Sequence, residues 1–330
     1  MTNERKGVSG STSIFLNIAL LVSVAYFAAS ALTIDSTQNA KIYFGYYEAY
    51  LNETASYSSI YQASSLENAL EAHAAGLTSL LLVQDAFLIS APNRMILAPE
   101  WQTRWAALAQ RAAPFLHNGT ILGFNLGDEL VWNCLAPVNL TIMANAVRAA
   151  FPRSSGAIVW YNEATPPLSS QQDSCGHNVK DYSIPSALDW FSTDIYHMDG
   201  TVDGWVNRFV RSFYEEKIYP RLPTGVKVVL VPGSFGSNVN HFPNGTYVCD
   251  RHCYDVMCAH DAEDFVAWAK ADARVVGIFP WNWGGCPDCN GSRWTPPHTC
   301  CMDELGTRVQ PLTSANWQRL AKELMAVERP

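Results

Sequence analysis

Clusters of basic residues are absent from this sequence of 330 residues. Lysine and arginine together number 22, against 30 aspartate and glutamate residues, and the formal net charge is -8. Nucleic acids and anionic membranes attract proteins through concentrated positive charge. We therefore expect no nucleic acid partner and no binding to an anionic membrane surface. Charged residues are only 16% of the chain and hydrophobic residues are 48%, which is typical of a well-packed globular protein.

Internal repeats and low-complexity tracts are also absent, and no Gly-x-Gly-x-x-Gly pattern follows the first apolar run. That pattern marks dinucleotide-binding folds, in which its glycines let the backbone approach a pyrophosphate. Its absence argues against a bound nicotinamide or flavin, and we expect no cofactor. Aromatic residues, in contrast, are abundant, and the 11 tryptophans exceed what a core needs. Exposed aromatic rings suit flat amphipathic ligands such as sugars.

The longest apolar run lies near the N-terminus, between Ile14 and Thr33, and follows Arg5 and Lys6. It ends in small residues, and Ala29-Ser30-Ala31 has the form of a signal-peptide cleavage site. The run is also close to the ~20 residues of a membrane-spanning helix, so an uncleaved anchor remains an alternative. Residues 1–33 are thus predicted to be a signal peptide or a signal anchor. Both alternatives predict that residues 34–330 are secreted or lie on the extracellular or lumenal side of a membrane.

Cysteine is missing from the first 133 residues, and all nine cysteines follow. Five Asn-x-Ser/Thr sequons accompany them, at Asn52, Asn118, Asn139, Asn244 and Asn290. In an oxidising compartment most of the cysteines should form disulfides, and the odd count leaves at least one unpaired within the chain. Cys286-Pro-Asp-Cys289 with Cys300-Cys301 could instead bind zinc. The sequons and the N-terminal segment favour disulfides, so we expect a glycoprotein with no metal site.

Short apolar runs alternate with helical patterns from about residue 40 onward. Most of the runs are unbroken, as expected of parallel strands that are buried on both faces. The predicted strands are Lys41–Tyr47, Thr78–Gln84, Ile121–Leu126, Ala157–Tyr161, Leu188–Tyr196, Val226–Val231 and Val275–Trp281. The predicted helices are Ser65–Gly76, Glu100–Phe115, Leu140–Phe151, Val202–Tyr219, Ala262–Ala273 and Ser314–Val327. This alternation predicts one parallel α/β domain over residues 34–330.

Polar side chains follow nearly every predicted strand. A closed (β/α)8 barrel would bring the carboxyl ends of all its strands to one mouth, where such enzymes carry their chemistry. We therefore expect a single TIM barrel, in which an eighth strand is short, irregular or unrecognised near the N-terminus. Two cysteine-rich loops, predicted over Pro232–His260 and Gly284–Gln310, would emerge at the same mouth and are long enough to suggest a function.

Four segments resemble parts of TIM-barrel glycoside hydrolases. Gly123-Phe-Asn-Leu-Gly-Asp-Glu129 resembles the fourth strand of those barrels, where one catalytic acid follows an apolar run. Trp160-Tyr-Asn-Glu-Ala164 has an Asn-Glu pair that is common in that superfamily. Asp189-Trp-Phe-Ser-Thr-Asp-Ile-Tyr-His197 resembles a later strand that ends in Asp-x-Tyr, and Val275–Trp283 is similar to the last strand, whose tryptophan forms the floor of a sugar site. The resemblance implies an oligosaccharide or polysaccharide substrate.

Three carboxylates are candidates for catalysis on this resemblance: Glu129, Glu163 and Asp194. Glu129 would be the proton donor, because the adjacent charge of Asp128 and burial at the mouth would both raise its pKa. Successive residues of a strand face opposite ways, so only one of Asp128 and Glu129 should meet the substrate unless the strand breaks there. Candidates for substrate binding are Asp128, Asn162, Tyr196, Trp281, Trp283 and Glu48.

One feature departs from the large retaining clan of these enzymes. The predicted strand Val226–Val231 is followed by Pro232-Gly-Ser-Phe235, with no glutamate where that clan has its nucleophile. Glu163 or Asp194 could take this role, as could the substrate's own acetamido group, because Asp-Glu pairs also resemble those of enzymes that cleave N-acetylhexosamines. The alternative is a barrel that has lost catalysis and binds glycans or a protein partner.

Overall fold

The computed structural model describes residues 41–92, 94–169, 175–176, 182–196, 204–236, 251–284 and 306–326. The N-terminal apolar segment, the four cysteines considered for zinc and the sequons Asn244 and Asn290 lie outside these ranges. Among the residues that the structure describes, none of the helices has the length and apolar character needed to cross a membrane.

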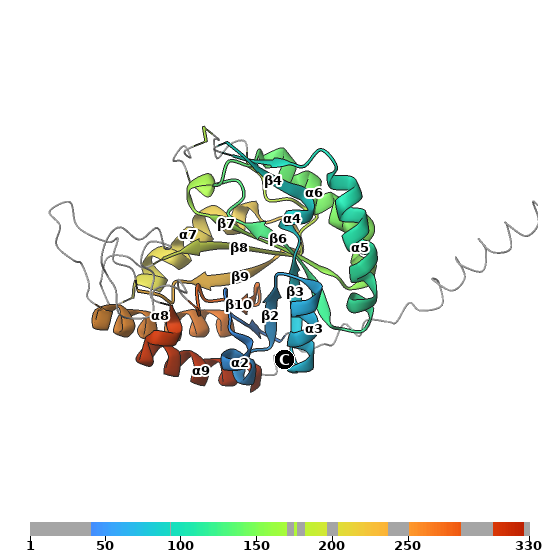
Figure 1. Ribbon diagram of the computed structural model, residues 1–330. Helices are drawn as coiled ribbons and strands as arrows, with labels where there is room; N and C mark the ends of the chain where they lie inside the picture. The colour runs from blue at the N-terminus through green and yellow to red at the C-terminus, as the bar shows by residue number, and fades with distance from the viewer. Residues whose placement is uncertain are drawn as a thin grey trace, which may run out of the picture. The chain divides into compact units, whose positions relative to one another are not determined.

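Eight parallel strands form a nearly closed barrel (Figure 1). They are β1 (Tyr43–Phe44), β2 (Ile60–Ala63), β3 (Thr78–Leu82), β6 (Ile121–Asp128), β7 (Ile158–Ala164), β8 (Trp190–Ile195), β9 (Lys227–Pro232) and β10 (Val275–Ile278). The order around the sheet is β1-β10-β9-β8-β7-β6-β3-β2. The two ends of this sheet meet through Ser59, whose backbone N–H donates to the Phe44 carbonyl over 2.8 Å. The prediction of a TIM barrel is confirmed.

The strand that the sequence did not reveal is β2, near the N-terminus. It has only four residues, Ile60-Tyr-Gln-Ala63, and two of them are partly exposed. Such a short run with one glutamine has neither an unbroken apolar pattern nor a clear alternation. The first strand is likewise shorter than predicted, since only Tyr43 and Phe44 of the range Lys41–Tyr47 have strand geometry.

The helices lie outside the ring of strands in Figure 1. The longer ones are α3 (Leu66–Ala74), α5 (Trp101–His117), α6 (Pro137–Ala150), α8 (Arg251–Ala271) and α9 (Pro311–Ala326). Short helices are α2 (Leu51–Thr54), α4 (Gln84–Phe87) and α7 (Arg211–Phe213), of which α7 lies between the π-type turns η4 (Val206–Val210) and η5 (Tyr214–Ile218). The Ser65 hydroxyl caps α3 by accepting from the Asn68 N–H over 3.1 Å.

The predicted loop Pro232–His260 is wrong in its second part. Helix α8 begins at Arg251, eleven residues before the predicted start at Ala262, and includes Cys253 and Cys258. The cysteines in this segment and the polar residues between them had indicated a loop. In the structure Tyr254, Met257 and Cys258 form a small buried cluster of their own, which packs this first part of the helix.

The core has two layers, as expected of a barrel. Side chains from different strands meet inside the ring; these are Tyr47, Ile60, Leu80, Trp160, Trp190, Val229, Val231 and Phe279. A larger cluster packs the outer faces of the strands against the helices, with Phe44, Phe124, Tyr161 and Phe191 among its strand residues. Each strand therefore has inward and outward positions, which decide the side chains that reach the mouth.

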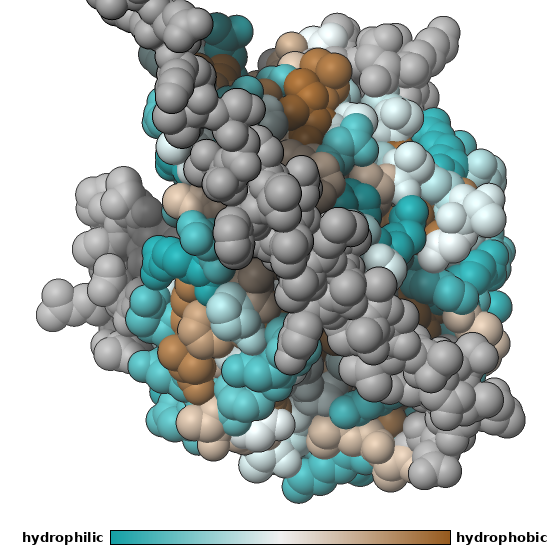
Figure 2. All heavy atoms as spheres, turned by 90° about the vertical axis from the view of Figure 1, so that its right-hand side faces the viewer, coloured by the Kyte–Doolittle hydropathy of each residue, from teal (hydrophilic) through white to brown (hydrophobic). Residues whose placement is uncertain are grey.

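One face of the molecule, which carries α3 and α5, is shown in Figure 2. Its hydrophobic residues lie in small groups among hydrophilic ones. The large exposed hydrophobic side chains of the described residues are spread over separate elements; they are Leu70, Ile89, Val138, Phe209 and Leu312. Single exposed hydrophobic residues are normal on a soluble surface and identify no docking site.

Candidate functional site

The end of β6 contains a bulge that turns Asp128 into the barrel. Along the ladder with β7, Asn125 pairs with Trp160 and Asp128 with Asn162, so two residues of β6 lie opposite one of β7. Gly127 supplies the bend with φ of 141°, and its N–H donates to the Asn125 side chain over 3.0 Å. A side chain at position 127 would meet the Gln84 and Leu130 side chains at 2.7 and 2.9 Å. The bulge therefore reverses the alternation beyond Leu126.

The chain turns again at Glu129, directly after the last residue of β6. Glu129 has φ of 49°, a left-handed conformation that is uncommon for a residue with a side chain. Its N–H donates to the Asn162 carbonyl over 3.0 Å, which ties the turn to β7. The strand breaks at this pair, so the alternation rule does not separate the two acids. Asp128 and Glu129 both lie beside the hydrogen-bond network around Asn162.

Asn162 joins the acids of three strands. Its side-chain amide donates to Asp128 over 2.8 Å and to Asp194 over 3.1 Å. Its carbonyl oxygen accepts from the Ser192 hydroxyl over 2.7 Å, and Ser192 in turn accepts from Trp160 Nε1 over 2.9 Å. This chain fixes the direction of the amide, because its oxygen is already occupied by a donor. Asn162 is 1% exposed, so its two amide protons are committed to the two carboxyl groups.

Glu129 and Asp194 are hydrogen-bonded to each other through their carboxyl groups. Burial raises the pKa of Glu129 to about 10, with further contributions from the charge of Asp194 and from the hydrogen bond to it. Burial also raises the pKa of Asp194, while hydrogen bonds from Glu129, Tyr196 and Asn162 act in the opposite direction. Glu129 therefore carries a proton near neutral pH, and the charge of Asp194 beside it contributes to this.

Asp128 lies beside this pair and has an intermediate protonation. Its carboxylate accepts from Asn162 and, over 3.3 Å, from the Tyr47 hydroxyl. Burial and the charge of Asp194 raise the pKa of Asp128 to about 7, although the two hydrogen bonds lower it. Three acids thus meet at the mouth with pKa values that their surroundings raise to different extents. Separation of this kind is how a site assigns acid and base roles.

Glu163 is buried on the outer face of β7, away from that group of acids. Its carboxylate accepts from the backbone N–H groups of Val131 and Trp132, each over 3.2 Å, and of Ala164 over 2.9 Å. The Tyr161 hydroxyl donates to it as well. Burial raises the pKa of Glu163 to about 8, against the effect of these bonds. The structure thus separates Glu163 from Glu129 and Asp194, and its contacts are those of a positioning residue.

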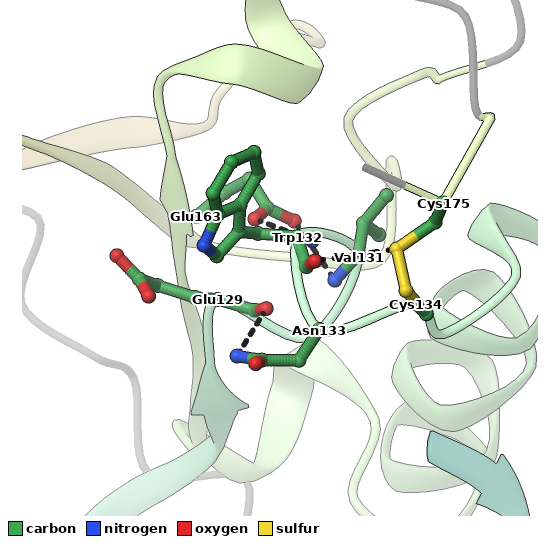
Figure 3. The surroundings of a disulfide bond; sticks show 7 residues. All are labelled: Glu129, Val131, Trp132, Asn133, Cys134, Glu163 and Cys175. Carbon is green, nitrogen blue, oxygen red and sulfur yellow. Dashed lines mark hydrogen bonds between the residues drawn. A yellow bond between two sulfur atoms is a disulfide. The ribbon is translucent and has the colours of Figure 1, made fainter. Parts of the chain in front are cut away.

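The loop from Glu129 to Cys134 is held at two points (Figure 3). Glu163 binds its backbone from one side, and a disulfide joins Cys134 to Cys175. In Figure 3 the Glu129 carboxylate and the Trp132 indole both extend away from this disulfide. The prediction that cysteines form disulfides is confirmed for Cys134 and Cys175, and Cys253 is also disulfide-bonded. Among the described cysteines, Cys258 has a free thiol, which is buried.

The two candidate tryptophans lie in different layers. Trp281 is half-buried at the mouth, where its ring is 5.0 Å from that of Tyr47, and it lines a cavity there. Trp283 is 3% exposed and packs in the outer core, with its Nε1 donating to Glu53 over 2.7 Å. The chain has left the strand after Ile278, so residues two apart no longer share a face. Trp281 can contact a ligand and Trp283 cannot.

Tyr196 and Glu48 both lie near the mouth. The Tyr196 hydroxyl donates to Asp194, and its ring packs edge-on against Phe235 at 5.1 Å. Glu48 lines a cavity beside Trp281, and partial burial of its carboxyl group raises its pKa above the usual value. The structure therefore brings Glu48, Asp128, Glu129, Asn162, Asp194, Tyr196 and Trp281 together, and places Glu163 and Trp283 outside the mouth.

Two cavities open beside Asp128 and share Asp128 and Gln84 in their walls. The first, of about 420 Å³, lies over β1, β2 and β3 and is lined by Tyr47, Glu48, Ala49, Tyr61, Gln62, Ala63, Ser64, Leu82, Gln84, Asn125, Asp128 and Trp281. The second, of about 520 Å³, lies against the antiparallel hairpin of β4 (Leu88–Ala91) and β5 (Arg94–Leu97). Cavities of this size suit ligands larger than a metal ion or a water molecule.

Sequence reasoning missed Tyr47, Gln84 and Asn125 as site residues. Tyr47 binds Asp128, and all three line the first cavity. Alternation within the strands contains part of this signal, because Asn125 lies on the inward face between the outward residues Phe124 and Leu126. No group of three or more potential metal ligands occurs among the residues that the structure describes.

The fold is that of a TIM barrel, and the solved structures that resemble it include glycoside hydrolases. A beta-galacturonidase of family GH2 from Eisenbergiella tayi, bound to glycerol, has a TM-score of 0.51 with this chain at 9% sequence identity. The match covers 82% of this chain and 45% of the galacturonidase, so the chain spans less than half of that protein's length. At this identity the likeness shows a shared fold and nothing finer.

Two further solved structures have TM-scores of 0.49. One is a beta-1,4-mannanase of family GH113, with 12% identity over 87% of this chain and 99% of the mannanase. The other is the beta-glucuronidase of Ruminococcus gnavus, with 11% identity over 82% of this chain and 45% of that enzyme. No protein-family model matches the sequence, and no curated protein matches it either. The particular family therefore has no support beyond the barrel itself.

Proposed function

We propose that this protein is a glycoside hydrolase in which Glu129 is the proton donor. The observation that carries the proposal is the hydrogen-bonded pair of Glu129 and Asp194 at the barrel mouth. Glu129 holds a proton at neutral pH because burial and the charge of Asp194 raise its pKa to about 10, and Asp194 beside it is the second carboxyl group. Hydrolysis of a glycosidic bond needs these two functions, an acid for the leaving oxygen and a carboxylate for the sugar or the water.

The reaction would proceed as follows. Glu129 gives its proton to the glycosidic oxygen as the bond from that oxygen to the anomeric carbon breaks. Asp194 either attacks the anomeric carbon, and water later releases the sugar, or removes a proton from the water that attacks directly. In the first route the ionised Glu129 takes a proton from the water that releases the sugar. In the second route the proton that Asp194 has taken from water returns to Glu129. One water is consumed in both routes. Asn162 and Tyr196 hold Asp194 in place through hydrogen bonds.

The separation of the Glu129 and Asp194 carboxyl groups in the substrate complex decides between the two routes. Retaining enzymes separate their carboxyl groups by about 5–5.5 Å and inverting enzymes by about 6.5–9.5 Å. The anomer released first, measured by proton NMR, distinguishes the two outcomes.

Substitution of Glu129 by Gln tests the proposal. The amide is nearly isosteric but cannot protonate the leaving oxygen, so turnover of labelled oligosaccharides should fall by about 10²–10⁴-fold. Binding of the same oligosaccharides should persist. The control is Glu71→Gln, which changes an exposed glutamate on α3 and should leave the rate unchanged. Wild-type turnover in Glu129→Gln would refute the assignment of the acid.

The residues at the end of β9 favour a second function, which is glycan binding without catalysis. Pro232 is followed by Gly233 and Ser234, and Ser234 is fully buried. The Ser234 hydroxyl accepts from Trp317 Nε1 over 3.0 Å and bonds to Thr307, so it is part of the core. Residues 227–236, the part of this strand and its end that the structure describes, include no acid. Glycan binding by the wild-type protein, together with no cleavage of any bound glycan, would support this function over the first.

The secretory location is part of the same proposal. The disulfide between Cys134 and Cys175 and the bonded Cys253 support it, because structural disulfides persist in oxidising compartments. The sequon residue Asn118 is exposed at the end of α5 and accessible to a glycan. A mobility shift after enzymatic removal of N-linked glycans from the protein of secreting cells would support this location. Recovery of the unglycosylated protein in the cytosol would contradict it.

A further inference from the structure

The second cavity lies between two segments that the barrel itself does not require. One wall is the β4–β5 hairpin, which contributes Ser90, Ala91, Arg94 and Met95. The opposite wall is the Glu129–Cys134 loop, which contributes Leu130, Trp132, Asn133 and Cys134. Asp128 and Gln84 form the side that this cavity shares with the first one. The cavity therefore extends from Asp128, one member of the group of acids, toward the hairpin.

Both walls are fixed in position before any ligand binds. The Met95 N–H donates to the Asn133 carbonyl over 3.2 Å, which joins the hairpin to the loop. The loop is further held by Glu163 and by the disulfide at Cys134. A site whose walls are held in this way avoids part of the entropy cost of ordering them on binding. These contacts distinguish the cavity from a gap between mobile surface loops.

The lining has the chemistry of a sugar site. The Trp132 indole is half-buried and offers a flat apolar surface, and Gln84, Ser90 and Asn133 offer hydrogen-bond donors and acceptors around it. An aromatic face combined with amide and hydroxyl groups matches the alternating C–H and O–H faces of a pyranose ring. A sugar bound here would lie beside Asp128, which also lines the first cavity. Neighbouring units of one oligosaccharide would then occupy the two cavities.

Arg94 gives the cavity a charge preference. Every other arginine with a described side chain donates to an acid or to a backbone carbonyl, as Arg148 does to Asp189 and Arg221 to the Leu168 carbonyl. Arg94 makes no hydrogen bond or ion pair with the residues that the structure describes, although it is within a wall of the cavity. Guanidinium groups bind carboxylates, sulfates and phosphates through paired N–H donors.

The acids around the cavity do not cancel this charge. Asp128 is the one carboxylate among the residues that line this cavity. The protonated and ionised forms of Asp128 are both populated near neutral pH. It already accepts from Tyr47 and Asn162, so its oxygens face those donors. The Glu163 carboxylate is directed into the outer core, where backbone groups use it. Arg94 is therefore available to a ligand.

We propose that the cavity between the β4–β5 hairpin and the Glu129–Cys134 loop binds an anionic sugar unit, with Arg94 on its carboxylate or sulfate group and Trp132 against its ring. This unit neighbours the one that is cleaved at Glu129, so the substrate is an acidic oligosaccharide. The inference rests on the proposed function for the position of the cleaved bond. The binding of an acidic glycan can be tested without it.

Binding should be measured in the Glu129→Gln background, so that no ligand is consumed. The probes are oligosaccharides of equal length that are neutral, carboxylated or sulfated. Substitution of Arg94 by Ala should weaken binding of one acidic set by about 10–100-fold, the effect of losing one charge-assisted contact. Binding of the neutral set should change less than threefold. Arg94→Lys should retain part of the preference, since it keeps the charge without the paired donors.

The control is Lys322→Ala on α9, which removes another exposed cation outside the cavity. It should leave all three sets unchanged, and the difference between the carboxylated and sulfated sets identifies the anion. Equal loss of neutral and acidic ligands in Arg94→Ala, or no loss, would overturn the inference even if the protein hydrolyses glycans. An Arg94-dependent preference in a protein that cleaves none of them would support this site and refute the proposed catalysis.

Discussion

The hydrogen bonds to Glu163 make a quantitative prediction about the loop that carries Glu129. The carboxylate oxygen Oε1 accepts from Trp132 and Ala164, and Oε2 from Val131 and Tyr161. Glu163→Ala removes both oxygens. Val131 retains the Tyr161 hydroxyl at 3.3 Å. Three donors therefore lose their acceptor: the N–H groups of Trp132 and Ala164 and the Tyr161 hydroxyl.

Each buried donor without a partner costs about 1–3 kcal/mol, so the free energy of unfolding should fall by about 3–9 kcal/mol. A domain of this size shifts its melting temperature by about 2 °C or more per kcal/mol, which gives a decrease on the order of 6–18 °C. Glu163→Gln keeps one oxygen for Trp132 and Ala164, and should cost only about 1–2 kcal/mol. Differential scanning calorimetry at constant pH measures both changes.

Activity provides the second measurement, because Glu163 would act on the reaction only through the loop. We expect turnover to fall in Glu163→Ala at temperatures where the protein is still folded, and to be largely restored in Glu163→Gln. Glu71→Gln is the matched control for removal of a glutamate charge. Melting of both Glu163 variants within 1 °C of wild type would refute the reasoning about this buried carboxylate.

The remaining predictions concern the disulfide and the paired acids. Replacement of both Cys134 and Cys175 by Ser removes a link across 41 residues and should lower the free energy of unfolding by up to about 4 kcal/mol, measured by urea denaturation; no change would contradict the role of the bond. On the acidic side, turnover should fall when Asp194 gains a proton, at a pH above the usual aspartate pKa of about 3.9. On the basic side, turnover should fall near pH 10, where Glu129 loses its proton. A rate profile whose acidic midpoint lies at or below 3.9 would contradict this assignment. Trp281→Ala should raise KM by about tenfold with a smaller change in kcat, and an unchanged KM would exclude ring stacking at the mouth.

The barrel could be predicted from the sequence because its strands are buried on both faces. Runs such as Val226–Val231 are unbroken and lie at the spacing of βα units, which few other folds combine. The exception, β2, is partly exposed and only four residues long. A strand that pairs with one neighbour over so short a length is defined by the closure of the barrel rather than by its own residues.

The candidate site could be predicted only as far as the strand geometry was regular. Along β7 the ladder with β8 has no shift, so Asn162 faces inward and Glu163 outward, as alternation requires. Alternation applied to β7 would have separated these two residues. Along β6 the bulge at Gly127 reverses the pattern, and a glycine alone does not reveal whether it adopts the required conformation.

The pairing of Glu129 with Asp194 could not be inferred from either motif. The two residues are on β6 and β8, and β7 lies between them. Their contact depends on the left-handed turn at Glu129 and on the position of Asn162, which are properties of the folded chain. The sequence predicted the acids at the strand ends, and the fold determines which of them share a proton.

The protonation of Glu129 is the most direct test of this account. Carboxyl carbon NMR of the protein labelled at glutamate measures it, and the Glu129 resonance is identified by its loss in Glu129→Gln. The account predicts that Glu129 remains protonated through neutral pH and titrates near pH 10, and that Asp194→Asn lowers this midpoint because it removes the neighbouring charge. Titration of Glu129 near the usual glutamate value of about 4.3 in the wild-type protein would contradict the shared proton and, with it, the assignment of Glu129 as the acid.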